Sequence, residues 1–411
     1  MPCQNMFPRE VDVMSSLSLR GVWSFSFRSL FLASLLLSGL PAMANPDKQT
    51  WLGLPVDFAA QSYVFKRGPA IELDKVKVQT SSPIEVSRAW LLPDWAEWLT
   101  EFKTRKVRVV AGELTATPSA LARLGFVDGP SSRIVSRLEF SSLKLMFGGS
   151  PLMLPAGEML FGDNGAMTRI RLQLEGGVNL DLTPLEGGRL GILLQTGSFK
   201  WQALAPFRFD SVVAQGELTD DQVLLDRIGT GGDGGSLSGV LRLVSAGKFL
   251  LEGEIKMDSL RARDVIDRLY PRAVVDGVLS GSFKINTSAD SFDALGKAVV
   301  AEGVYTLKTG SIDRFGLLEG MRRSGSGVVG GGLVRFDQIS GKFSGRTGGA
   351  VQVSIQGLTS GALRGSSNFS IDPTGRLRGS VSGTMSLPGG EVISRTFELA
   401  GKPDAPSLIA P

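Results

Sequence analysis

Few residues in this sequence have side chains that could carry out chemistry, and they form no known catalytic arrangement. There is no histidine among the 411 residues, so the commonest general base and the commonest metal ligand are both missing. The only cysteine is Cys3, and no Gly-x-Ser-x-Gly nucleophile motif is present. The adjacent carboxylates Asp220 and Asp221 lie in a polar segment that we expect to be a solvated turn. The sequence therefore predicts a protein that is not an enzyme and uses no metal or other cofactor.

The segment Gly229–Gly235 reads Gly-Thr-Gly-Gly-Asp-Gly-Gly, a composition also found in loops that hold phosphate or calcium. It lacks the Gly-Lys-Ser/Thr ending that a phosphate loop requires. It also occurs only once, whereas glycine-rich calcium ladders are built from repeats. We therefore predict that it is a hairpin turn.

A second glycine-rich segment, Ser324–Gly332, is interpreted as a mobile connection because chains rich in glycine and serine are flexible. The basic pair Arg322 and Arg323 lies directly before it. Guanidinium groups bind phosphate through paired hydrogen bonds, which makes these arginines candidate contacts for a lipid phosphate. The alternative is structural, since the C-terminal end of a helix attracts basic residues.

The N-terminal segment has the pattern of an export signal. Two arginines precede the apolar run Leu30–Leu40, and Ala42-Met43-Ala44 follows it. A basic region, a short apolar region and small residues at the end indicate a secretory signal peptide cleaved between Ala44 and Asn45. The run is short of the ~20 residues that span a bilayer. We predict a protein of the Gram-negative periplasm, with an uncleaved inner-membrane anchor facing the periplasm as the alternative.

The overall charge is close to balanced, with 44 basic and 40 acidic residues and a net charge of +4. Basic residues are not clustered with aromatic ones, so nucleic acid is excluded as a partner. Cys3 precedes the predicted cleavage site, and the exported chain would contain no disulfide. Its stability must then come from strand pairing and apolar burial.

Alternation of apolar and small polar residues is the dominant pattern, and the 52 glycines punctuate it. Such alternation indicates strands with one apolar and one polar face. In residues 70–78 the alternation is interrupted once, which suggests a bulge or kink. Other clear strands on the N-terminal side are Val107–Thr115, Ile134–Phe147, Met167–Leu174, Val178–Leu182 and Leu190–Gln195. The prediction is a mainly β fold, an elongated and curved antiparallel meander with a few amphipathic helices packed on it.

Helical spacing of apolar residues predicts four helices, near residues 91–102, 260–270, 289–300 and 312–323. The first contains tryptophans and is followed by basic residues, a combination that can lie at a membrane surface. The alternative is a helix that covers one end of the sheet. The other three are expected to pack on the apolar face of the sheet.

Apolar residues alternate most clearly in the segment 333–387, where small polar residues occupy the opposite face. If the apolar residues of neighbouring strands share one face, they form a continuous strip that could hold lipid chains. The alternative is an ordinary core covered by the predicted helices. The residues of this predicted strip are Val351, Val353, Ile355, Phe369, Ile371, Val381, Met385 and Leu387.

Three regions follow from these patterns. Residues 1–44 are the signal peptide, 45–210 an N-terminal β-rich region with one helix, and 211–411 a C-terminal β-rich domain. An aromatic cluster around Pro206 marks the boundary. In the last region Gly216, Gly239 and Gly253 are separated by 23 and 14 residues, and Gly341, Gly365 and Gly379 by 24 and 14. These near-equal intervals suggest a duplicated meander in which each glycine opens a strand.

The C-terminal half also contains longer motifs. They are Gly277-Val-Leu-Ser-Gly-Ser-Phe283, the segment 295–303 leading into Val304-Tyr-Thr-Leu-Lys-Thr-Gly-Ser-Ile-Asp-Arg314, Leu333-Val-Arg-Phe-Asp-Gln-Ile-Ser-Gly-Lys-Phe343 and Phe397-Glu-Leu-Ala-Gly-Lys-Pro403. Over about residues 212–408 this half resembles the AsmA-like family of bacterial envelope proteins. The resemblance implies a role in outer-membrane biogenesis, in which larger family members hold lipid chains in a long β-sheet groove. This chain departs from that pattern because it is short and has a signal with the features of a cleavable one.

We therefore expect a non-enzymatic periplasmic protein that binds or shields lipid acyl chains in support of outer-membrane biogenesis. Phospholipid or another envelope lipid is the expected partner, and proteins of the inner or outer membrane are further candidates. The alternative is a structural component of an envelope assembly or secretion machine, resembling the type II secretion N component. Such a protein would act by adding a strand of its partner to the edge of its sheet.

Overall fold

The computed structural model describes residues 49–51, 54–65, 69–93, 107–126, 135–197, 211–232, 234–270, 272, 274–323 and 325–410. The chain divides into the units Met1–Gln49 and Thr50–Pro411, and all of the described residues except Gln49 belong to the second unit. The predicted signal peptide, its predicted cleavage site, the aromatic cluster near Pro206 and most of the predicted helix 91–102 lie outside the described residues. The start of that helix is different from the prediction, because Leu91–Pro93 end a strand.

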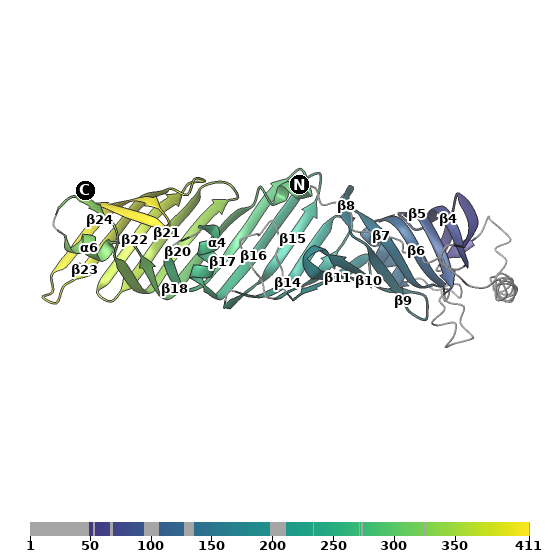
Figure 1. Ribbon diagram of the computed structural model, residues 1–411, viewed down its shortest axis with the longest axis horizontal. Coiled ribbons are helices and arrows are strands. Elements are labelled where there is room, and N and C mark those ends of the chain that lie inside the picture. Colours follow the sequence, from purple (N-terminus) through teal and green to yellow (C-terminus); the bar gives the residue numbers. More distant parts are fainter. Residues whose placement is uncertain are drawn as a thin grey trace, which may run out of the picture. The chain divides into compact units, whose positions relative to one another are not determined.

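The described residues of this unit form one large sheet that is mainly antiparallel, curved and not closed (Figure 1). The mainly β prediction is therefore confirmed. The strands up to residue 196 are β1 (Gln49–Trp51), β2 (Leu54–Asp57), β3 (Ala60–Phe65), β4 (Pro69–Val78), β5 (Ile84–Pro93), β6 (Val107–Ala116), β7 (Val135–Phe147), β8 (Ser150–Leu154), β9 (Gly157–Phe161), β10 (Met167–Leu174), β11 (Val178–Leu185) and β12 (Arg189–Thr196).

The sheet continues without a break into the predicted C-terminal domain, because β12 pairs with β13. The remaining strands are β13 (Ser211–Leu218), β14 (Gln222–Gly232), β15 (Gly235–Ser245), β16 (Phe249–Arg261), β17 (Val275–Ala289), β18 (Val300–Asp313), β19 (Gly327–Val329), β20 (Leu333–Arg346), β21 (Val351–Ser360), β22 (Leu363–Ile371), β23 (Leu377–Ser386), β24 (Val392–Lys402) and β25 (Ala405–Ala410). The division into domains near residue 210 stays a prediction.

One parallel pair interrupts the antiparallel order among the described strands, between β6 and β7. The crossover contains helix α3 (Pro118–Arg123) and the turn η2 (Leu124–Phe126). Thr117 caps α3 by accepting the Ala120 N–H, and Pro118 occupies the first turn, where it costs no hydrogen bond. Leu121 is fully buried, so α3 fills the interior of the N-terminal strands. The sequence patterns did not predict this helix.

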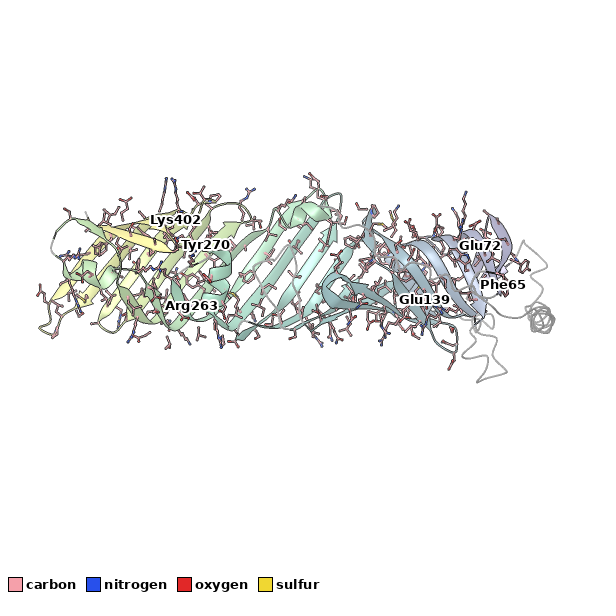
Figure 2. All side chains as sticks on the ribbon, viewed as in Figure 1. Phe65, Glu72, Glu139, Arg263, Tyr270 and Lys402 are labelled. Atoms are coloured by element: carbon pink, nitrogen blue, oxygen red, sulfur yellow. The ribbon has the colours of Figure 1, made fainter. Side chains whose placement is uncertain are left out.

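The outer face of these N-terminal strands is charged and laced with ion pairs across neighbouring strands. Arg108 contacts Glu139, which is labelled in Figure 2, at 2.5 Å. Arg171 lies 3.2 Å from Glu158 and 3.5 Å from Asp181. Exposed pairs of this kind each contribute little to stability, but they identify the solvated face. The kink predicted in residues 70–78 is confirmed at Lys75, whose φ is +52°.

The three predicted C-terminal helices are present, and each is shorter than predicted. They are α4 (Ala262–Leu269), α5 (Phe292–Leu295) and α6 (Leu317–Arg322). Residues expected at the ends of the longer helices are instead taken into β17 and β18, which run to Ala289 and Asp313. The strand ladder gives each of those residues a hydrogen-bonded neighbour, and this tertiary pairing overrides local helix spacing.

The segment Ser324–Gly332 contains strand β19, and the prediction of a mobile connection is wrong for that part. Residues Gly327–Val329 pair with β25, the last strand in the chain. Val329 is buried in the same core as Leu317 and Met321 of α6. Between β18 and β20, the chain thus forms α6 and then contributes a short strand that borders β25.

The six glycines with near-equal intervals lie inside strands and do not open them as predicted. Gly216, Gly239 and Gly253 lie in β13, β15 and β16, and their counterparts lie in β20, β22 and β23. The two sets therefore occupy the same relative strands. The first glycine of each set, Gly216 or Gly341, borders a shift of register. The predicted hairpin turn at Gly229–Gly235 is confirmed, since Gly232 pairs with Gly235.

Candidate functional site: an apolar strip across the C-terminal strands

Seven of the eight residues of the predicted strip share one face of the sheet, and the eighth, Leu387, follows the end of β23. Val351 pairs with Ile371, and Val353 pairs with Phe369. Ile355 pairs with Ser367, which pairs in turn with Val381. Residues directly opposite each other in a ladder point to the same side. The strands thus bring these side chains together as the alternation predicted.

The register extends this face over many more strands, in two adjacent rows that contain no polar side chain. We call these two rows the apolar strip. The first row runs Gly239, Ile255, Phe283, Gly303, Phe343, Val353, Phe369, Gly379 and Leu399. The second runs Leu225, Leu241, Gly253, Ile285, Ala301, Gly345, Val351, Ile371 and Leu377.

Glycine and bulky residues face each other along the strip. The rings of Phe283 and Phe343 lie 6.3 Å apart on either side of β18, where Gly303 occupies the row. A Cβ at Gly303 would lie 2.6 Å from the Phe283 Cβ, and one at Gly379 would lie 2.5 Å from that of Phe369. The glycines therefore leave the space that the rings use.

Most residues of the two rows were not among the eight predicted from the sequence, and those missed in the middle of the strip include Phe283, Ile285 and Phe343. They lie on β17 and β20, next to the strands on which the prediction concentrated. Their alternation with Ser282, Lys284 and Ser344 is the signal that would have found them.

One side of the strip is covered. Further along the strands, beyond the row that contains Tyr305, a buried core includes helix α6 and the row Leu279, Leu307, Ile339 and Leu358. Leu317 and Met321 of α6 are fully buried there.

This coverage corrects part of the predicted strip. Ile371, Val381 and Met385 are buried members of the C-terminal core, so the covered-core alternative holds for them. Val351, Val353, Ile355, Phe369 and Leu387 are only half-buried. Along the two rows, Phe283, Ile285 and Phe343 are half-buried as well. The middle of the strip is thus an apolar surface that the described helices leave partly open.

The strip ends at a second core on its N-terminal side. Phe147 stacks on Phe249 with ring centroids 6.2 Å apart, and Phe249 meets the edge of Phe292 at 6.3 Å. Beyond these rings the interior is filled by fully buried side chains such as Leu121 and Leu190. The open part of the strip is therefore bounded at both ends by packed cores.

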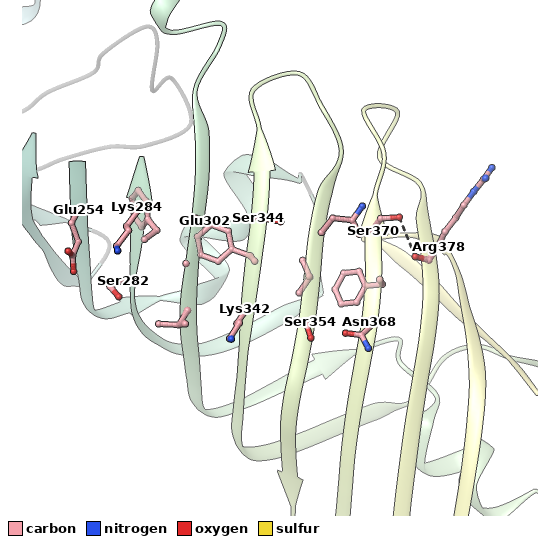
Figure 3. A pocket seen from close by; sticks show the side chains of 17 residues that line it. Glu254, Ser282, Lys284, Glu302, Lys342, Ser344, Ser354, Asn368, Ser370 and Arg378 are labelled. Carbon is pink, nitrogen blue, oxygen red and sulfur yellow. Dashed lines mark hydrogen bonds between the residues drawn. The ribbon is translucent and has the colours of Figure 1, made fainter. Parts of the chain in front are cut away.

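The opposite face of the same strands is polar and carries a broad hollow of about 650 Å³. Its lining includes Lys284, Lys342, Asn368, Gln352 and Arg378 (Figure 3). Twelve of the seventeen lining residues alternate to the side opposite Phe283, so the hollow opens on the polar face. This arrangement separates a polar exterior from an apolar interior within a single layer of strands.

Arg322 and Arg323 lie at the C-terminal end of α6 and are exposed. The Arg323 Nε lies 3.1 Å from Glu319 Oε1, one helical turn earlier. Arg395 donates to the carbonyl oxygens of Gly320 and Arg323 at the same helix end. These contacts support the structural interpretation, in which basic residues satisfy the helix terminus.

Ionisable groups on the apolar side are few. Burial raises the pKa of the Tyr305 hydroxyl, which lies beside the strip opposite Gly281 and Gly341. Burial also raises the pKa of Tyr270. Low-dielectric surroundings disfavour the phenolate, so both shifts mark an apolar interior. Among the described residues there is no cluster of histidine, cysteine or acidic side chains that could hold a metal ion.

Comparison with known proteins finds no matching family model, no similar curated protein and no similar solved structure. The AsmA-like assignment therefore stays a prediction that rests on the motifs of the C-terminal half. Within the described part of the chain, no helix is both long and apolar enough to cross a bilayer.

Proposed function

We propose that this is a non-enzymatic protein of the bacterial envelope that binds or shields lipid acyl chains and thereby supports outer-membrane biogenesis. The observation that carries the proposal is the apolar strip, a half-open surface without a polar side chain on neighbouring strands. Soluble proteins rarely leave such a surface uncovered unless it binds something. The polar opposite face and the predicted export signal are consistent with a water-filled compartment between two membranes.

The dimensions of the strip suit lipid tails. From β14 to β22 it crosses eight paired strands, which at ~4.8 Å per strand spacing gives roughly 34 Å. One leaflet of a bilayer has a hydrocarbon depth of about 15 Å, half of the ~30 Å core. The tails of one or two lipids would therefore fit. Each methylene removed from water would contribute about 0.8 kcal/mol.

The packed cores at both ends favour a compartment that holds individual lipids over a groove that runs the length of the sheet. A lipid would enter through the open side, between the strand ends that α4 and α6 do not cover. This distinguishes the chain from the long conduits that the family resemblance implies for larger members.

The test compares two neighbouring substitutions on β21. Val353→Asp places a carboxylate on the half-buried strip, whereas Ser354→Asp places one on the polar face. We expect phospholipid to co-purify with the wild-type protein and with Ser354→Asp, and to be lost from Val353→Asp while its circular dichroism stays native. Lipid would be measured by mass spectrometry of the extracted protein. A wild-type protein without lipid, or a Val353→Asp variant that fails to fold, would instead indicate an ordinary core.

A second function is favoured by one observation at the other end of the sheet. Strand β3 pairs only with β4 among the described residues, and its sequence Ala-Gln-Ser-Tyr-Val-Phe has no charge. Tyr63 and Phe65 on it are 67% and 77% exposed, and Figure 2 labels Phe65 at this end. Strands at the edge of a sheet usually carry charged residues that prevent them from pairing with another chain. Because β3 carries no charge, it could accept a strand from an envelope partner.

If β3 accepts a strand from a partner, a charge placed on β3 should abolish the contact with that partner. Ser62→Lys would place a charge on the edge and should abolish a photocrosslink from a probe at Tyr63 to a partner protein in intact cells. The melting temperature should not change, because β3 is at the surface. A crosslink that persists in Ser62→Lys would refute this second function without bearing on lipid binding.

A further inference from the structure

A hollow of about 270 Å³ lies beside helix α4, apart from the apolar strip, and three arginines line it. The lining residues are Arg263, Asp267, Arg272, Val274, Asp313 and Arg314. They come from α4, from the residues that follow it and from the end of β18. Figure 2 labels Arg263. All three arginines are exposed, while Val274 is buried.

The positive charges in this hollow are only partly balanced. Arg263 Nη2 lies 3.5 Å from Asp276 Oδ2 and 3.8 Å from Asp313 Oδ2. Arg314 Nη1 donates to the backbone oxygen of Asp404 at 2.9 Å. Within the described part, no carboxylate forms an ion pair with the guanidinium of Arg272 or Arg314.

The two carboxylates in the lining already have partners. Asp313 faces Arg263, and Asp267 Oδ1 accepts the backbone N–H of Arg272. The second of these bonds fixes the backbone of Arg272 against α4. The hollow thus has three arginines against two carboxylates in its lining, and in the described part of the chain two of its guanidinium groups form no ion pair.

Both of these arginines have a strained backbone. Arg272 has φ +66° and Arg314 has φ +57°, and they are two of only five non-glycine residues with positive φ in the described part. A side chain at positive φ costs stability that glycine would not. Strained residues that gather at one site indicate a function for their side chains. Here the shared feature is a guanidinium group that lines the same hollow.

We propose that this hollow binds a phosphate group, either on a lipid headgroup or on a soluble phosphate. Guanidinium groups bind phosphate oxygens in a paired, planar geometry that few other ligands match. Helix α4 packs on the C-terminal core through Val265, Ile266 and Tyr270. A phosphate held here would therefore lie at the surface directly beside the apolar interior. The phosphate site is argued only from the residues that line the hollow. Only the suggestion that the phosphate belongs to a lipid rests on the proposed function.

Glycine substitution separates binding from folding. The double variant Arg272→Gly/Arg314→Gly removes both guanidinium groups and relieves both positive φ angles. We expect its melting temperature to equal or exceed that of the wild type, while its affinity for inorganic phosphate, measured by calorimetry, falls at least tenfold. Ser259→Gly is the matched control, because Ser259 has φ +55° but does not line the hollow. It should leave phosphate affinity unchanged.

Two further probes identify the source of the phosphate. If short-chain phosphatidate binds more tightly than inorganic phosphate, and the double variant loses both, the ligand is a lipid headgroup. Equal affinities that the double variant loses together indicate a soluble phosphate. Wild-type protein without saturable phosphate binding, or a double variant that binds as tightly, would overturn the site. Short-chain diacylglycerol, which has no phosphate, tests the apolar strip separately, so the two proposals can fail independently.

Discussion

Replacing Gly303 by alanine tests whether the strip depends on glycine facing aromatic rings. The new Cβ would lie 2.6 Å from the Phe283 Cβ and 2.8 Å from its Cα. Because Cβ contacts under 3.0 Å essentially do not occur, β17 and β18 would have to move apart. Overpacking of this kind costs about 1–3 kcal/mol. Alanine also removes the roughly 0.5–1 kcal/mol entropic disadvantage of glycine in a strand, which offsets part of the loss.

Gly229→Ala is the control that isolates the steric cost. Gly229 lies in β14 with no atom within 4 Å of its added Cβ and with no positive φ. This variant should become more stable by about 0.5–1 kcal/mol. The free energy of unfolding, measured with urea and circular dichroism, should therefore differ between the two variants by about 1–3 kcal/mol. Equal shifts in both variants would refute the packing argument, because only the alanine at position 303 meets atoms of a neighbouring strand within 3.0 Å.

The packed cores and their ionisable groups give three more predictions. Leu317→Ala should lower the free energy of unfolding by about 2–5 kcal/mol, because Leu317 is fully buried. Leu333→Ala is the control, since Leu333 is 44% exposed and its substitution should change that free energy little. Asp220→Ala should cost about 1–3 kcal/mol, measured by urea unfolding, because its carboxylate accepts two hydrogen bonds from the first turn of α3 at 2.8 and 2.7 Å; a neutral effect would contradict this tie. The pKa of Tyr305 is raised above 10.0 by burial, so its contribution to stability is present below pH 10 and is lost as the pH rises towards the folded pKa. Tyr305→Phe should remove that part of the alkaline decrease in melting temperature.

The strands could be predicted from the sequence because each carries its own alternation. Val351-Gln-Val-Ser-Ile355 specifies two faces without reference to any neighbour. The face shared by β21, β22 and β23 followed from the same pattern. Alternation could not show which of these apolar side chains other parts of the chain cover. Ile371 and Val353 look alike in sequence, yet Ile371 is buried in the C-terminal core and Val353 is half-open.

Elements that form only through contacts with residues far away in the sequence were also missed, because alternation records nothing about such contacts. Strand β19 lies in a glycine-rich segment, and only its pairing with β25 makes it a strand. Helix α3 is short, and its stability comes from burial of Leu121 among strands far along the chain. Its one local signal was Thr117 followed by Pro118, a helix cap and first-turn proline. The arginine hollow beside α4 depends on backbone angles that no residue pattern records.

The pairing of β19 with β25 has a consequence for the order in which the protein folds. Residues Gly327–Val329 pair with Leu408–Ala410, so this ladder cannot form until β25 has been synthesised. During that interval α6 and β19 have strands β20–β23 beside them but not the full core. Contacts between residues so far apart in sequence form late because chain closure must come first. Chains that emerge N-terminus first therefore leave this end of the sheet open longest, and a chaperone would find its binding site there.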